Sequence, residues 1–341
     1  MTFRTPSRIF LSGLALLMIL SVLSIGIGVS DLGIWGTFSD PDARQILWEV
    51  RVPRTLAALL AGAGLAVSGQ AMQILVRNRF IEPMSAGAGQ SAALGVLLVT
   101  LLVPSAAIWV KMVGASLAAL TGSLVLMAIL RPMPPTQPLL PALVALVYGG
   151  VISAVVSFIA FQGDLAQFLG SWLTGEFSGV LRGRYELLWI AGGASVLMYL
   201  IADRLTLLSL GEDAARALGV NVGLITATAV AGLSVVTAMI VVSVGSIPFV
   251  GLVVPNLTAR LTGDNLRRAL PLTALCGALM VLGADILSRL IRFPYEIPVA
   301  TTVAVIGAVL FLVLINRDPR SRGAAGVNPA ASADRKGGSH V

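Results

Sequence analysis

Long apolar runs constrain this chain more than any other feature. About ten predominantly apolar segments follow one another along the 341 residues. Several of them extend over ~18 or more residues almost without charge, as bilayer-spanning helices do. Charged residues make up only 11 % of the chain, too few to surround a soluble core of this size. The sequence therefore predicts an all-α polytopic membrane protein.

The chain is expected to form one transmembrane domain over residues 1–316 and a disordered polar tail over 317–341. The second span exceeds the ~20 residues that cross a bilayer, so it is expected to tilt or protrude. The eighth is short and follows glycine and proline, as broken or re-entrant segments do. The predicted spans are approximately 8–29, 46–75, 84–103, 106–130, 138–162, 186–204, 222–243, 248–262, 268–291 and 297–316.

The first apolar run has two interpretations. It follows Arg4 and Arg8, as the apolar part of a signal peptide would. However, it is long for that role and no A-x-A cleavage motif follows it, which favours a retained first span.

The basic residues are divided unequally between the two membrane faces. With ten spans both termini lie on one side, and that side receives 15 of the 23 lysines and arginines. The positive-inside rule then places both termini in the cytoplasm. Membrane topology accounts for the net charge of +7 without nucleic-acid binding.

Small residues recur at helical spacing within two of the predicted spans. Such residues let helices pack closely in lipid, so we expect close helix crossings at these positions. They are Gly62, Gly64, Ala66, Ser68 and Gly69 in the second span, and Gly114, Ala118 and Gly122 in the fourth.

Motifs for nucleotide or metal chemistry are missing from the sequence. A Walker A loop needs a Gly-Lys pair, and the two lysines, Lys111 and Lys336, do not provide one. Neither H-E-x-x-H nor G-x-S-x-G occurs. A single cysteine, Cys276, and a single histidine, His340, are too few for a thiol or imidazole metal site. The sequence predicts a protein without catalytic residues, whose energy from ATP would come from another chain.

A short polar segment, GEDAARALGV at residues 211–220, interrupts two apolar runs on the predicted cytoplasmic side. Acidic residues in its first turn and Arg216 in its last suit the helix dipole, and Gly219 is suited to end the helix. Two helical turns are marginal in water unless they dock. The segment is therefore either a surface connector or a helix that inserts its stripe of Ala214, Ala217 and Leu218 into a partner.

Charged residues also gather at the opposite, outer face. Arg51 and Arg54 lie one turn apart and could present their guanidiniums to the carboxylates of a docking protein, or to lipid phosphates. Asp285 and Arg289 are four residues apart, so they could neutralise each other, or Arg289 could face outward as well. Glu296 lies in the loop before the tenth span.

Four motifs, in order, resemble the iron-chelate uptake permeases, the membrane subunits of ATP-driven importers for iron–siderophores and vitamin B12. The resemblance covers approximately residues 45–316. The motifs are RVPR followed by a glycine-rich span and Q…RN…P; GEDAARALGV; GSIPFVGLVVPN…R…GDN; and GADILSRL…YEIPVATT.

Departures from the family pattern indicate a branch. Asn78-Arg79-Phe80 stands where Asn-Pro-Leu is common, Asn256 follows Pro255 where histidine is common, and Ala300 replaces a usual glycine. With GEFSGVLRGRYELLW at 175–189, these residues resemble the branch that handles siderophores such as petrobactin and anguibactin. They weaken a vitamin B12 assignment.

The resemblance implies a type II ABC importer permease in the bacterial cytoplasmic membrane. It implies a second permease copy or paralogue, two ATP-binding subunits carrying ATP and Mg, a periplasmic or lipid-anchored siderophore-binding protein, and no cofactor on this chain.

The resemblance also assigns roles to residues. It assigns binding-protein docking to Arg51, Arg54 and Arg289, and the substrate path to the fifth and tenth spans at a dimer interface. Tyr148, Ser153 and Ser157 are candidates for pore lining, with interhelical hydrogen bonding as the alternative. The cytoplasmic coupling helix, 211–219, comprises the ATPase-coupling residues Gly211, Glu212, Asp213, Ala214, Arg216, Ala217, Leu218 and Gly219.

The importer interpretation has two rivals, and its substrate class has an alternative. A secondary transporter driven by ions would need ionisable groups in mid-span, and almost none is evident. An intramembrane enzyme lacks its catalytic motifs. A vitamin B12 or haem importer permease of the same family stays open.

Overall fold

The computed structural model describes residues 6–27, 41–133, 139–183, 185–263 and 265–316, and within them every regular element is a helix. The predicted tail, 317–341, and the end of the predicted first span lie outside the described residues. The all-α fold class is confirmed.

Helices occupy all ten predicted positions, with three short helices between them. The ten positions hold α1 (Pro6–Gly26), α2 (Pro41–Ile46) with the π-helical turn η2 (Leu47–Arg51) and α3 (Val52–Leu75), α4 (Ala88–Leu102), α5 (Ile108–Leu130), α6 (Leu140–Gln162), α8 (Leu188–Leu200) with α9 (Ala202–Ser209), α11 (Val222–Ser243), α12 (Val250–Thr262), α13 (Leu266–Leu290) and α14 (Val299–Asn316). The short helices are α7 (Ala166–Leu173), the 3₁₀ turn η3 (Tyr185–Leu187) and α10 (Glu212–Ala217).

Not every one of these helices is long enough to cross a membrane alone. Among the described residues six helices are long and apolar enough, or seven if the bent pair α8 and α9 forms one span. The second span is long, as predicted, and runs over 32 residues from Arg44 to Leu75. With 13 residues, α12 extends only about 20 Å, which confirms that the eighth segment is short. The predicted number of ten spans is therefore approximate.

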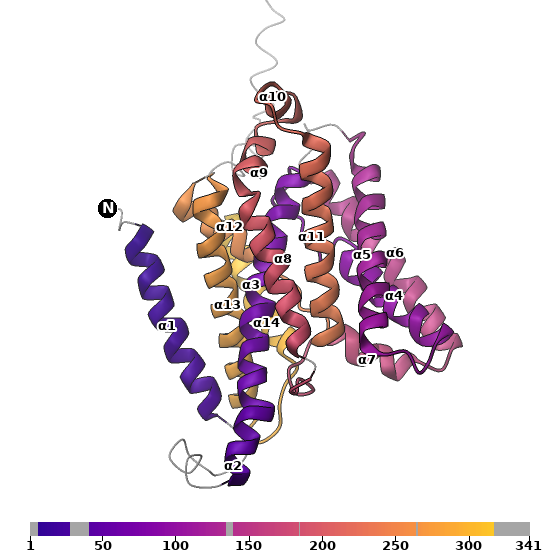
Figure 1. Cartoon of the computed structure of the whole chain (residues 1–341), viewed down its shortest axis with the longest axis vertical. Helices are drawn as coiled ribbons and strands as arrows, with labels where there is room; N and C mark the ends of the chain where they lie inside the picture. The colour runs from indigo at the N-terminus through magenta and orange to yellow at the C-terminus, as the bar shows by residue number, and fades with distance from the viewer. Residues whose placement is uncertain (1–5, 28–40, 134–138, 184, 264, 317–341) are drawn as a thin grey trace, which may run out of the picture.

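Helix α3 lies at the centre of the bundle and packs against α13, α12, α8 and α11 (Figure 1). On one side α4, α5 and α6 form a group, and on the other α1 lies apart along the flank. Only 6 % of the apolar window of α1 is buried. Helix α1 packs mainly on α13, with Leu17 and Leu20 against the core, and its polar end contacts add to this packing.

Two glycine pairs let α3 approach its neighbours closely. A Cβ added at Gly62 would lie 2.3 Å from the carbonyl oxygen of Gly277 in α13. A Cβ at Gly69 would lie 2.1 Å from the carbonyl oxygen of Gly251 in α12. Any side chain at these crossings would force the backbones apart, so the predicted role of the small residues in close packing is confirmed here.

The two ends of the bundle carry the two candidate sites. Helix α10 lies at the upper end in Figure 1, and α2, which leads into α3, lies at the lower end. Helix α13 begins near α9, where Thr206 Oγ1 accepts a hydrogen bond from the Leu266 amide at 3.2 Å. It ends beside the start of α3, so α13 extends from α9, which contacts α10, to the end of the bundle that carries α2.

Candidate functional site

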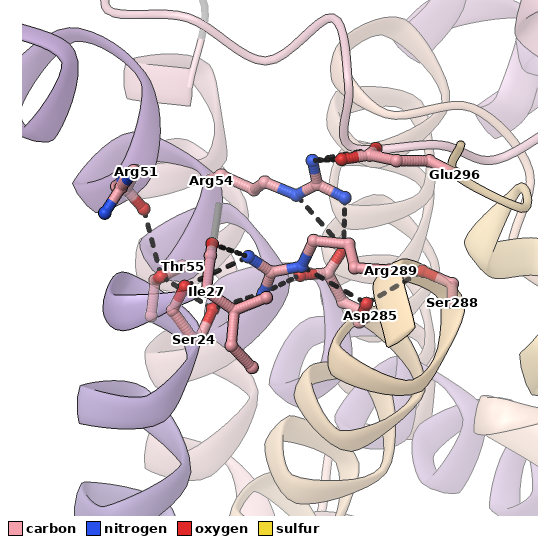
Figure 2. Close-up of polar contacts among 9 residues, drawn as sticks. All are labelled: Ser24, Ile27, Arg51, Arg54, Thr55, Asp285, Ser288, Arg289 and Glu296. Atoms are coloured by element: carbon pink, nitrogen blue, oxygen red, sulfur yellow. Dashed lines mark hydrogen bonds and ion pairs between the residues drawn. The ribbon is translucent and has the colours of Figure 1, made fainter. Parts of the chain in front are cut away.

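Arg54, at the start of α3, is held between two carboxylates (Figure 2). Its Nε and Nη2 both donate to Asp285 Oδ1 of α13, at 3.1 and 2.8 Å. Its Nη1 donates to both carboxylate oxygens of Glu296, at 2.8 and 2.9 Å. All three nitrogens of this guanidinium therefore donate to acidic side chains of the same chain.

Arg289, in the last turn of α13, connects this cluster to α1 (Figure 2). Its Nη2 donates to Asp285 Oδ2 at 2.7 Å and to Ser24 Oγ at 2.7 Å. Its Nη1 donates to the carbonyl oxygens of Ser24 and Ile27, at 3.0 and 3.1 Å. Terminal carbonyls of a helix carry partial negative charge, so a guanidinium there is stabilising.

Arg51 makes a similar contact from the other side of α1. Its Nη1 donates to the carbonyl oxygen of Ile25 at 3.2 Å. Thr55 Oγ1 donates to the Arg51 carbonyl oxygen and lies 3.0 Å from Ser24 Oγ. Arg51 and Arg289 thus hold the end of α1, in addition to the packing of α1 on α13.

The cluster is buried, and within it Arg54 and Arg289 are balanced by Asp285 and Glu296. Arg51, Arg54 and Arg289 are 9, 8 and 7 % exposed, and Asp285 is fully buried. The prediction that Arg51 and Arg54 present their guanidiniums to water is wrong for this chain alone, because helix-terminal carbonyls and carboxylates already bind them. The alternative in which Asp285 and Arg289 pair is confirmed. Sequence reasoning missed that Arg54 shares the same carboxylate.

At the opposite end, the predicted helix in GEDAARALGV is present as α10. Gly219 has φ +80° and its amide donates to the Arg216 carbonyl, while the Val220 amide donates to that of Ala215. These two bonds make a Schellman motif, which confirms that Gly219 ends the helix. Arg216 pairs with Glu212 at 3.2 Å on the exposed surface.

One face of α10 is left open. Ala215 packs inward and is fully buried, whereas Ala214 and Ala217 are exposed and Leu218 is 60 % exposed. The three residues of the predicted apolar stripe are therefore uncovered within this chain. Whether a partner binds them stays a prediction.

Glu82, between α3 and α4, is a buried carboxylate to which the sequence reasoning gave no role. It is 2 % exposed, and its Oε1 accepts hydrogen bonds from the Phe249 amide at 2.8 Å and Ser85 Oγ at 3.4 Å. Phe249 caps α12 with φ 70°, and residues 245–249 are irregular, as predicted. The sequence feature that could have identified Glu82 is an acidic residue between two apolar spans, beside Pro83.

The candidate pore residues of α6 do not share one environment. Tyr148 is half-buried and its hydroxyl donates to the Gly122 carbonyl of α5 at 2.9 Å, the interhelical bond considered as its alternative. Ser153 is half-buried and Ser157 is exposed. Pore lining by these residues stays a prediction.

In the described ranges, no group of three or more histidine, cysteine or acidic side chains could hold a metal ion. The absence of a cofactor on this chain also stays a prediction.

Comparisons with known proteins agree over almost the whole membrane region. The model of the FecCD transport family matches residues 16–317. The petrobactin import system permease protein YclN of Bacillus subtilis is 39 % identical over 309 residues, which cover 89 % of this chain and 96 % of that protein. The ferric-anguibactin transport system permease protein FatD of Vibrio anguillarum is 38 % identical, covering 78 and 84 % of the two chains. A solved structure of a metal-chelate type ABC transporter has a TM-score of 0.77 at 29 % identity, covering 92 % of this chain and 100 % of its own.

Proposed function

This chain belongs to the FecCD transport family and is the permease of an ABC importer, and from that premise we propose that it conducts iron(III)–siderophore complexes across the bacterial cytoplasmic membrane. The observation that carries the substrate class is the similarity to permeases named for petrobactin and anguibactin, which extends over most of the chain. The residues at 78–80, 175–189 and 256 resemble the same branch.

ATP hydrolysis is assigned to two separate subunits, because this chain has no Walker A loop. Segment 211–219 is proposed to dock into them through the open stripe of α10. ATP binding must favour one conformation of the permease over another, since a ligand with equal affinity for both shifts nothing. Under the positive-inside rule, this end and both termini face the cytoplasm.

The substrate path is assigned to the interface with a second permease, a copy or a paralogue. Helices α6 and α14 both leave large apolar side chains uncovered, among them Val147, Val151, Phe158, Val305 and Leu312. Two such faces can meet in a dimer. A ferric siderophore is too large for the interior of one densely packed bundle, which supports a path between two chains.

Docking of a siderophore-binding protein is assigned to the end that carries Arg51, Arg54 and Arg289. These guanidiniums are engaged inside the chain. A binding protein that uses them must therefore replace an internal partner with one of its own carboxylates.

An uptake experiment tests the function. Cells that lack their own siderophore permeases would express this chain with the ATPase and binding protein of its own transport system. We expect uptake of radioactive iron from ferric petrobactin that stops when the ATPase carries an inactive Walker lysine. Uptake that follows the proton gradient and ignores ATP depletion would refute the importer mechanism. Transport of cobalamin or haem instead of the iron complex would refute the substrate class.

A further inference from the structure

The two carboxylates of the arginine cluster differ in how tightly the fold holds them. Asp285 lies inside α13, is fully buried and forms ion pairs with both Arg54 and Arg289. Glu296 lies outside the helices, and its side chain is 32 % exposed. Its two carboxylate oxygens accept from Nη1 of Arg54, whereas Asp285 Oδ1 accepts from Nε and Nη2 of the same guanidinium (Figure 2).

Glu296 also ties an exposed loop to the buried cluster. Residues 291–296 are all exposed, and α14 begins only three residues after Glu296, at Val299. Beyond the Glu296 carboxylate, the Ile297 amide donates to the Ser288 carbonyl at 3.2 Å and the Ala300 amide to the Gly175 carbonyl at 2.9 Å. The start of α14 is also packed into the core, where Val299 and Val303 are 1 and 0 % exposed. The pair with Arg54 is therefore an anchor of the exposed residues 291–296, and not of α14 itself.

We propose that Glu296 occupies Arg54 in the undocked permease as a stand-in for the binding protein, and that an acidic side chain of that protein displaces it on docking. This inference rests on the proposed function, since it specifies how the docking site operates. Asp285 stays in place throughout, because it also neutralises Arg289.

Charge balance makes this exchange feasible. Before docking, two guanidiniums face two carboxylates; after it, they again face two, one of which belongs to the partner. No buried charge is left unpaired at either stage, which would otherwise be strongly unfavourable. Glu296 returns to water when it is released, and a solvated carboxylate needs no partner in the protein.

The exchange carries the docking event to the loop that precedes the substrate path. Once Glu296 leaves Arg54, the exposed residues 291–296 lose an anchor close to α14, one of the two helices assigned to the path. Docking would thereby release this loop, while the buried Val299 and Val303 keep the start of α14 in the core.

The test measures docking of the purified siderophore-binding protein of the same transport system to the permease in nanodiscs. Glu296→Gln keeps the side-chain size and removes the competing charge, so we expect docking about three- to tenfold tighter. Arg54→Gln should weaken docking. In the Arg54→Gln background, Glu296→Gln should no longer tighten docking, because the charge that it frees is absent. Glu296→Asp, which keeps the charge but shortens the reach, should lie between wild type and Glu296→Gln.

A matched control separates this exchange from a general change in charge. Glu186→Gln removes one negative charge near the outer end of α8, where Glu186 contacts the Gly183 amide, and should leave docking unchanged. Equal tightening by both glutamine variants, or none by Glu296→Gln, would overturn the exchange.

A second measurement does not depend on the variants. Hydrogen exchange at the loop amides of Tyr295 and Ile297, which donate to the Arg292 and Ser288 carbonyls, should become faster when the binding protein docks, whereas protection there would overturn the proposal. If the wild-type permease does not bind that protein at all, it is the docking assignment of the proposed function that fails.

Discussion

Replacing Asp285 with asparagine tests whether the arginine cluster is held by charge balance. Asparagine has nearly the same shape, so packing around the fully buried position is kept. One oxygen can still accept from Arg54. The amide group, however, places hydrogen-bond donors against Arg289 Nη2, which now lies 2.7 Å from a carboxylate oxygen.

The magnitude follows from the charges that remain. Arg54 and Arg289 would face only Glu296, so one positive charge would stay unbalanced in a buried site. Removing one partner of a buried ion pair costs about 3–5 kcal/mol. Because Glu296 still neutralises Arg54, we expect a loss of about 3 kcal/mol, at the lower end of this range.

Unfolding in mixed micelles with increasing SDS, followed by a spectroscopic signal, measures this loss. The double variant Asp285→Asn with Arg289→Gln restores the balance, so its loss should be at least about 1 kcal/mol smaller than the sum of the two single losses. A loss below about 1 kcal/mol for Asp285→Asn, or simple additivity of the two changes, would show that charge balance does not hold the cluster.

Three further predictions address other parts of the molecule. Gly62→Ala should cost more than about 2 kcal/mol by SDS unfolding, since its Cβ would lie 2.3 Å from a carbonyl oxygen; Gly193→Ala in α8, with no atom near its Cβ, should be neutral or stabilising. Glu82→Ala should leave the Phe249 amide unsatisfied at a cost of about 1–3 kcal/mol and speed its hydrogen exchange, whereas Glu82→Gln should lose less; equal effects would exclude a capping role. Leu218→Asp should abolish the stimulation of ATPase activity by the docked binding protein while Leu218→Met retains it, and normal stimulation in the aspartate variant would contradict docking through α10.

Patterns within single segments predicted most of the architecture. Apolar runs placed helices at all ten expected positions, because a helix in lipid must satisfy its own backbone and its side chains must be apolar. The residues of GEDAARALGV were sufficient to predict α10 and its end. Charges that interact with the helix dipole, and a glycine in the left-handed conformation, both act within one helical turn.

The candidate site was predicted only in part. The pairing of Asp285 with Arg289 followed from their spacing on one helix, whereas the contacts of Arg54 with Asp285 and Glu296 join residues more than 200 positions apart. The residues next to a buried carboxylate in the sequence do not indicate which of two arginines it will pair with. Burial of Glu82 beneath α12 was missed for the same reason.

By itself the sequence determined that this chain is a helical membrane protein with a short polar helix at one end and no nucleotide loop, because composition and local periodicity carry that information. Only the tertiary structure decided what its arginines do. In sequence, Arg51, Arg54 and Arg289 were three cations on one face. In the fold, two of them cap the exposed helix α1, two share Asp285, and one holds Glu296 at the surface. A charge is assigned its partner by helix packing, and helix packing depends on contacts between residues far apart in the chain.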